Sequence, residues 1–196
     1  MRIYYGTEFL DTGTTIELIS IGIVVDDGRE YYAVNFDAPW QKVAQHDWLM
    51  ENVVPHLPLV DGIRRGPFGG QPQFQIDPTN VAVKPQWVIA NEVREFILST
   101  LEPELWAYYA AYDHVVLAQL WGPMVNLPTG VPMFTCDLKQ EHVRLGRPPL
   151  PSRDGDEHHA LADARHNRTM GTLLEGIARP VELLELVEFD PEEADA

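Results

Sequence analysis

Cysteine, long apolar runs and positive charge are all scarce in this chain. Cys136 is its only cysteine, so no disulfide can form within the chain, and we expect a reducing, cytoplasmic setting. No run of about 18 apolar residues occurs, which predicts no membrane span. The first residues lead directly into a strand-like pattern, without the basic and apolar segments of a signal peptide.

The 14 Lys and Arg residues stand against 30 Asp and Glu, and the net charge of −16 argues against non-specific binding of nucleic acid. The charge is uneven, because residues 181–196 hold seven acids and no Lys or Arg, which leaves −9 for the rest. Six of the basic residues fall between Lys139 and Arg168. They are either a solvated helix face or a local field that helps to hold a short phosphodiester.

Several well-known site motifs are also missing. The chain has no Walker loop, no G-x-G-x-x-G, no Cys/His spacing of a zinc site and no nucleophile-elbow sequence. The chemistry must therefore come from dispersed side chains.

The order of apolar patterns predicts one α/β domain over residues 1–180, with a mixed central sheet flanked by helices, followed by the acidic tail 181–196. Strands are expected first at 3–8, 16–25 and 30–34, as an antiparallel meander with a turn at Asp26–Arg29. Residues 55–85, rich in Pro and Gly, form a long insertion that is a lid, a dimer arm or a partly mobile segment. The other expected elements are helices at 45–52, 86–99, 113–121, 137–145 and 160–177, and a strand at 104–109.

Two acids stand out along this pattern. Glu8 lies at the end of the first strand within an apolar stretch, where burial of a carboxylate is costly unless it is paired or binds a metal; the alternative is an exposed strand end. Asp113 begins a helical stretch, where an N-cap is the commonest use of Asp, although its second oxygen could still face a metal.

His158 and Asp163 form the third candidate. Five helical residues rotate by about 500°, so the two side chains would not share a helix face. The two side chains can face the same site if His158 lies on the loop that enters the helix and Asp163 projects from inside the helix. A loop His beside a metal-binding Asp suits a general base, although His159 fits equally by residue type, and a surface His pair is the simpler alternative. Scattered acids with a late His are typical of a two-metal phosphodiester hydrolase.

Taken together, four segments resemble the three Exo motifs of the DEDDh 3′→5′ exonucleases, most nearly the RNase AS branch, a relative of RNase T and oligoribonuclease. They are 5–9 (YGTEF), 16–22 (IELISIG), 110–114 (AAYDH) and 158–165 (HHALADAR). The resemblance implies an RNase H-like fold, dependence on Mg²⁺ or Mn²⁺, a tendency to form a homodimer, and release of 5′-nucleoside monophosphates from RNA 3′ ends, preferably adenylate-rich.

The resemblance also implies roles for residues. Glu8, Asp113 and Asp163 match the metal-binding acids, and His158 matches the general base. Thr7 and Phe9 fall where relatives contact the terminal nucleotide, and base stacking of that kind contributes about 1–3 kcal/mol. Glu17, in the next strand, is a further candidate for contact with the terminal nucleoside.

Gly6 departs from this pattern. The family has Asp at this position, where it bridges both metals, and glycine supplies no oxygen. We therefore expect an exoribonuclease whose hydrolysis is impaired, because removal of one member of a concerted unit can lower a rate by several orders of magnitude. Two alternatives stay open: a non-catalytic nucleotide- or RNA-binding descendant, and a DEDDh nuclease for short oligonucleotides or DNA, which a requirement for the 2′-hydroxyl would distinguish.

Overall fold

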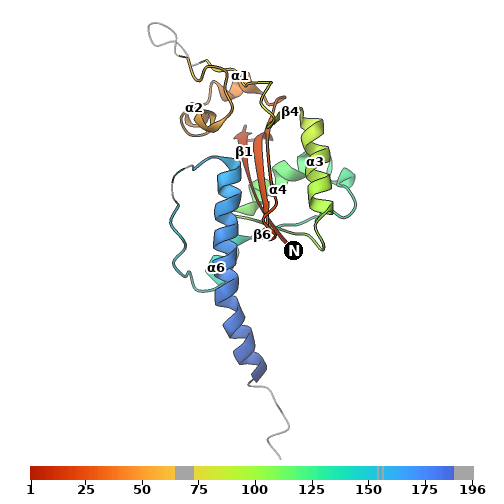
Figure 1. Cartoon of the computed structure of the whole chain (residues 1–196), viewed down its shortest axis with the longest axis vertical. Helices are drawn as coiled ribbons and strands as arrows, with labels where there is room; N and C mark the ends of the chain where they lie inside the picture. Colours follow the sequence, from red (N-terminus) through yellow and green to blue (C-terminus); the bar gives the residue numbers. More distant parts are fainter. Residues whose placement is uncertain (65–72, 154, 156, 188–196) are drawn as a thin grey trace, which may run out of the picture.

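The computed structural model describes residues 1–64, 73–153, 155 and 157–187. Its centre is a β-sheet with helices on either side (Figure 1). The sheet has six strands in the order β4-β3-β2-β1-β5-β6. β1, β2 and β3 are antiparallel neighbours, whereas β5 and β6 continue the sheet parallel to β1, and β4 lies parallel to β3. The predicted meander and the mixed α/β class are thus confirmed. The strands are β1 Arg2–Asp11, β2 Ile16–Val25, β3 Glu30–Asn35, β4 Val83–Lys84, β5 Glu104–Ala107 and β6 Cys136–Asp137.

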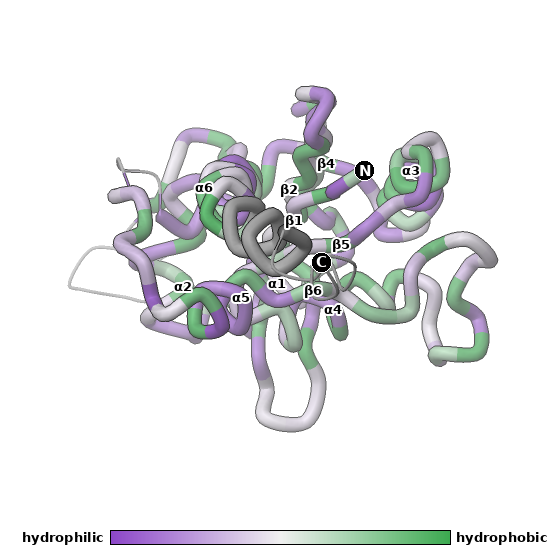
Figure 2. The backbone as a smooth tube through the Cα atoms, turned by 90° about the horizontal axis from the view of Figure 1, so that it is seen from below, coloured by the Kyte–Doolittle hydropathy of each residue, from purple (hydrophilic) through white to green (hydrophobic). Residues whose placement is uncertain are grey.

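Helices cover both faces of the sheet. α6 lies on one face, and α3 and α4 lie on the other (Figures 1 and 2). Side chains alternate accordingly along β1: Tyr5 packs with α3 and α4, and Tyr4 packs with α6. The helices are α1 Trp40–Val43, α2 Asp47–Asn52, α3 Gln86–Leu98, α4 Ala110–Gln119, α5 Leu138–Arg144 and α6 Ala160–Val187, with short 3₁₀ turns at Val54–His56 and Met124–Asn126. Among the described residues, none of these helices combines the length and apolarity that crossing a bilayer requires.

Several predicted boundaries were wrong. α4 begins at Ala110, three residues before the predicted start at Asp113, because Tyr109 takes a left-handed conformation (φ 55°) that turns the chain into the helix. α6 continues past 177 to Val187, into the segment predicted as a tail; residues 188–196 lie outside the described part. The two-residue strands β4 and β6 and the helix α1 were not predicted, since such short elements have no periodicity to detect.

The buried stripe of α3 leaves out its tryptophan. Trp87 is 68% exposed. The side chains that pack on the sheet are Ile89, Ala90, Val93 and Ile97. The predicted insertion at 55–85 includes isolated β-bridges between Leu59 and Ile76 and between Arg64 and Gln73. Its middle, residues 65–72, is outside the described residues, so its predicted role stays open.

α6 approaches the sheet closely where glycines remove side chains. A Cβ on Gly22 would lie 2.3 Å from the Cα of Leu161, and one on Gly6 would lie 3.1 Å from the Cβ of Asp163. The first turn of α6 therefore rests directly on β1 and β2. This contact fixes Asp163 opposite the middle of β1.

Candidate active site

Three carboxylates from three elements meet at one place beside β1. β5 pairs with β1 only along Arg2–Tyr4, so the rest of that edge of β1 is open to the start of α4. Glu8 projects from β1, Asp113 from the first turn of α4, and Asp163 from the first turn of α6. Residues distant in sequence thus form one acidic group.

Glu8 is 7% exposed and lies inside β1, which extends to Asp11, so the exposed strand end considered from the sequence is wrong. Burial, and then the negative charge of Asp163, raise the pKa of Glu8 well above its usual range, and a hydrogen bond joins the two carboxyl groups. Burial likewise raises the pKa of Asp163, although the Arg153 guanidinium opposes this effect. The two carboxyl groups therefore hold a proton to higher pH than isolated acids would.

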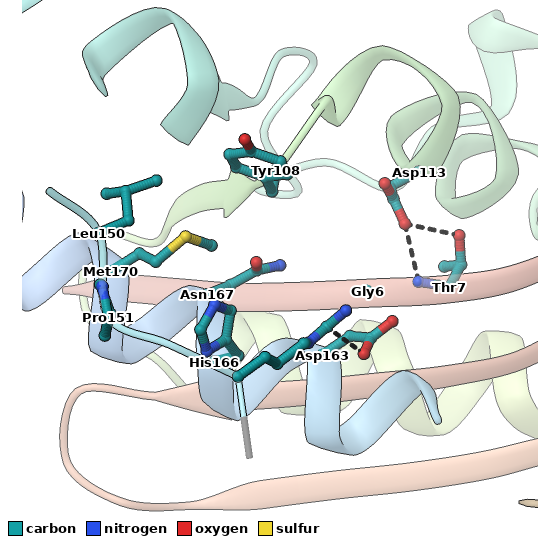
Figure 3. Close-up of a pocket in the computed structure, with 11 residues that line it drawn as sticks. Gly6, Thr7, Tyr108, Asp113, Leu150, Pro151, Asp163, His166, Asn167 and Met170 are labelled. Atoms are coloured by element: carbon teal, nitrogen blue, oxygen red, sulfur yellow. Dashed lines mark hydrogen bonds and ion pairs between the residues drawn. The ribbon is translucent and has the colours of Figure 1, made fainter. Parts of the chain in front are cut away.

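Asp113 is held by the neighbouring strand and is not the N-cap of α4, which is Tyr109. Its Oδ1 accepts hydrogen bonds from the backbone N–H and the hydroxyl of Thr7, both at 2.7 Å (Figure 3). Burial raises the pKa of Asp113 to about 6 even though both bonds from Thr7 lower it. The hydroxyl of Thr7, a predicted substrate contact, is thus directed to Asp113 in this arrangement.

His158 and His159 have different surroundings. His158 lies on the turn before α6 with a left-handed backbone (φ 67°), and its ring meets Trp48 edge-on at 4.7 Å between centroids. The loop placement expected for His158 is confirmed. His159 instead stacks on Tyr32 at 4.6 Å, and its Nδ1 accepts a hydrogen bond from the N–H of Ala162. Since His159 packs and caps α6, His158 is the better candidate for proton transfer.

A pocket of about 300 Å³ adjoins the acids. Its apolar end is formed by Leu150, Pro151 and Met170, and Asp113 and Asp163 lie at the other end (Figure 3). Helical spacing places several lining residues on one stripe of α6. This set consists of Asp163, His166, Asn167 and Met170, and the other lining residues are Gly6, Thr7, Tyr108 and Arg153.

Arg153 was not predicted from the sequence, yet its guanidinium forms an ion pair with Asp163 inside the pocket. Its charge also favours the ionised form of Glu8 and, together with burial, lowers the pKa of His166. The clustering of basic residues between Lys139 and Arg168 was the only sequence signal for it. No periodic pattern marks a single Arg in a loop.

The residues present do not complete the metal pair that the resemblance implies. Carboxylate oxygens are suitable ligands for Mg²⁺ or Mn²⁺. However, Gly6 offers no oxygen, and Asp163 is paired with Arg153. Outside the undescribed stretches 65–72, 154, 156 and 188–196, no three His, Cys, Asp or Glu side chains are arranged to hold one ion.

Two further predicted contacts lie away from the pocket lining. Phe9 is partly buried and stacks on Tyr112, with 6.3 Å between ring centroids and 21° between planes. Glu17 is at the exposed start of β2, where it accepts a hydrogen bond from Thr15. A register shift in the β1–β2 ladder between Glu8 and Phe9 separates the acidic residue from the aromatic one.

Fold and site together define an α/β protein with a buried group of acids beside a pocket of about 300 Å³. Two curated proteins of Mycobacterium tuberculosis are similar to it: 3′-5′ exoribonuclease MT2234.1 of strain CDC 1551 / Oshkosh and 3′-5′ exoribonuclease Rv2179c of strain ATCC 25618 / H37Rv. Each is 41% identical over 167 residues, which is 84% of this chain and 88% of the relative. No protein-family model matches the chain. The chain belongs to the family of these 3′-5′ exoribonucleases.

Proposed function

We propose that this chain carries a 3′→5′ exoribonuclease site for RNA 3′ ends and that Gly6 impairs its hydrolytic step. The observation that supports this most is the meeting of Glu8, Asp113 and Asp163 beside position 6. The kinship with two proteins named 3′-5′ exoribonuclease supplies the reaction. Adenylate-rich ends as substrate, 5′-nucleoside monophosphates as products and a homodimer are part of the proposal through the DEDDh resemblance.

The order of the strands supports an RNase H-like fold. A meander β1-β2-β3 with β5 and β6 added in parallel on the other side of β1 is the strand arrangement we expect of an RNase H-like domain. The acids then lie at the middle of the sheet, where its antiparallel and parallel halves meet at β1. Their elements are rigid and packed, so their geometry is set before any ligand binds.

The polar residues of the site have the following proposed roles. His158, on the turn beside Asp163, accepts a proton from the attacking water, and Thr7 keeps Asp113 directed toward the site. With an Asp at position 6, Glu8, Asp113 and Asp163 would form the oxygen set for Mg²⁺ or Mn²⁺. Because Gly6 leaves that set incomplete, the attacking water is poorly held in this chain.

The test compares three proteins on an RNA with a 3′ oligo(A) tail in the presence of Mn²⁺: the chain itself, Gly6→Asp and Gly6→Ala. A Cβ at position 6 requires α6 to yield by a few tenths of an ångström, since Ala160 O would lie 3.3 Å away. Gly6→Ala introduces this crowding without a carboxylate and is the matched control. We expect Gly6→Asp to release 5′-AMP from the 3′ end at least ~100-fold faster than either of the others.

Robust cleavage by the unaltered chain would contradict the impairment. A Gly6→Asp protein that binds the RNA but leaves it intact would favour a second candidate, a nucleotide- or RNA-binding member of the family. The ion pair between Arg153 and Asp163 favours that candidate, because it places a cation among the acids. An RNA whose 3′ end is blocked should resist all three proteins if cleavage proceeds from that end.

A further inference from the structure

Arg153 lies where the site's negative charge is concentrated. It precedes α6 on the loop after α5, and its ion pair with Asp163 is partly buried, with side-chain exposures of 28% for Arg153 and 20% for Asp163. Among the described residues that line the pocket, it is the one Lys or Arg. The acids stabilise the guanidinium in these surroundings, and its positive charge stabilises their ionised forms.

Arg153 faces a group of acids that lacks one carboxylate of the pattern that the sequence resembles. Asp113 and Asp163 line the pocket, Glu8 lies beside Asp163, and Gly6 supplies no further oxygen there. Arg153 supplies a positive charge to this acidic group from the chain itself. The loop before α6 thus places a cation beside the acids.

The rest of the pocket suits a nucleotide. Tyr108, Leu150 and Met170 give one end an apolar character that fits a nucleobase, and base–aromatic contact is tolerant of base identity. At the other end, the planar guanidinium of Arg153 matches the geometry of a phosphate, to which it can donate two parallel hydrogen bonds. Asp163 competes for the same donors while no phosphate is bound.

We infer that Arg153 binds the phosphate of a nucleotide in this pocket and that this binding needs no divalent cation. The inference rests on the proposed function, since it takes the ligand to be the terminal nucleotide of RNA or the free 5′-monophosphate. Arg153 leaves Asp163 when the phosphate arrives, and Asp163 then has its other partner, Glu8, as hydrogen-bond donor.

The test is equilibrium binding of 5′-AMP and of adenosine to the full chain, in excess EDTA and again with Mn²⁺. Arg153→Ala should weaken binding of 5′-AMP in EDTA by about 10- to 100-fold, as expected for loss of a charge-assisted contact, and leave adenosine unchanged. Asp163→Asn should act in the opposite direction and strengthen 5′-AMP binding several-fold, because it removes the competing anion. Arg94→Ala, which makes the same change in charge on α3 across the sheet, should have no effect.

Three results would overturn the inference. The first is 5′-AMP binding that requires Mn²⁺, which would leave the proposed function standing. The second is equal loss of 5′-AMP and adenosine binding in Arg153→Ala, which would indicate a structural role, and Asp163→Asn would then fail to strengthen binding. The third is no binding of 5′-AMP or oligo(A) RNA in either condition, which would overturn the proposed function as well.

Discussion

Asp113 Oδ1 accepts two hydrogen bonds from a single residue, Thr7, one from its backbone N–H and one from its hydroxyl, each 2.7 Å long. The backbone bond is available because β5 stops pairing with β1 at Tyr4, so the N–H of Thr7 has no strand partner on that side. The helix that carries Asp113 is thereby fastened to the strand that carries Glu8. This link sets the relative position of two of the three acids.

Thr7→Val tests this link. Valine keeps the shape and the backbone N–H but removes the hydroxyl, so the unfolding free energy should fall by about 1.5–3 kcal/mol, in line with hydrogen bonds to charged groups. The pKa of Asp113, about 6 in the intact chain, should rise further because one bond that favours its ionised form is lost. Urea unfolding and an NMR titration of Asp113 measure both effects. Thr7→Ser retains the hydroxyl and should change the unfolding free energy and the pKa of Asp113 only slightly. Equal effects of Val and Ser would contradict the role of the Thr7 hydroxyl in holding Asp113.

The packing of α6 on β2 leads to a second prediction. Gly22→Ala would put a Cβ 2.3 Å from the backbone of Leu161, so α6 must shift, and we expect a loss of about 1–3 kcal/mol in unfolding free energy. Gly176→Ala, within the same helix, meets nothing within 4 Å and should instead stabilise by up to about 1 kcal/mol through helix propensity. Denaturant midpoints of the two variants should therefore move in opposite directions. If Gly22→Ala were neutral, the close approach of α6 would be wrong.

The sequence was informative where a pattern is long. The strand β2 and the turn after it were predicted from residue type, and His158 was expected on a loop. The sequence could not show that Thr7 is directed to Asp113 or that Arg153 reaches Asp163, because these contacts depend on how separate elements pack. The register shift beside Glu8 was equally hidden, since a bulge has no composition of its own.

Glu8 gives the stability of the chain a particular pH dependence. The pKa of Glu8 in the folded protein is raised, chiefly by burial. The contribution of Glu8 to the unfolding free energy is therefore fully present below its pKa in the unfolded chain, about 4.3, and is lost as pH rises toward its pKa in the folded protein. The unfolding free energy of the intact chain, minus that of Glu8→Gln, should therefore fall by at least about 1.4 kcal/mol between about pH 5 and pH 8. The pKa of Asp113 is also raised, so its effect on stability has the same sign up to about pH 6. Asp113 is present in both proteins, so this effect largely cancels in the difference. Urea unfolding at both pH values measures the difference, and a constant or rising difference would contradict the burial argument.

Trp48 should position His158 in the active variant. The Trp48 ring is 47% exposed, so it contributes little to the core, yet it meets the His158 ring edge-on at 77° between planes. In the Gly6→Asp background, Trp48→Ala should lower kcat for the oligo(A) RNA by roughly tenfold with little change in KM, because a misplaced general base affects the chemical step more than binding. Trp48→Phe retains an aromatic edge and should keep most of the rate. Trp87→Ala, which removes an exposed Trp from α3, is the control and should leave kcat unchanged. If Trp48→Ala raised KM and left kcat intact, Trp48 would be a substrate contact, and His158 would hold its place through the turn before α6 alone.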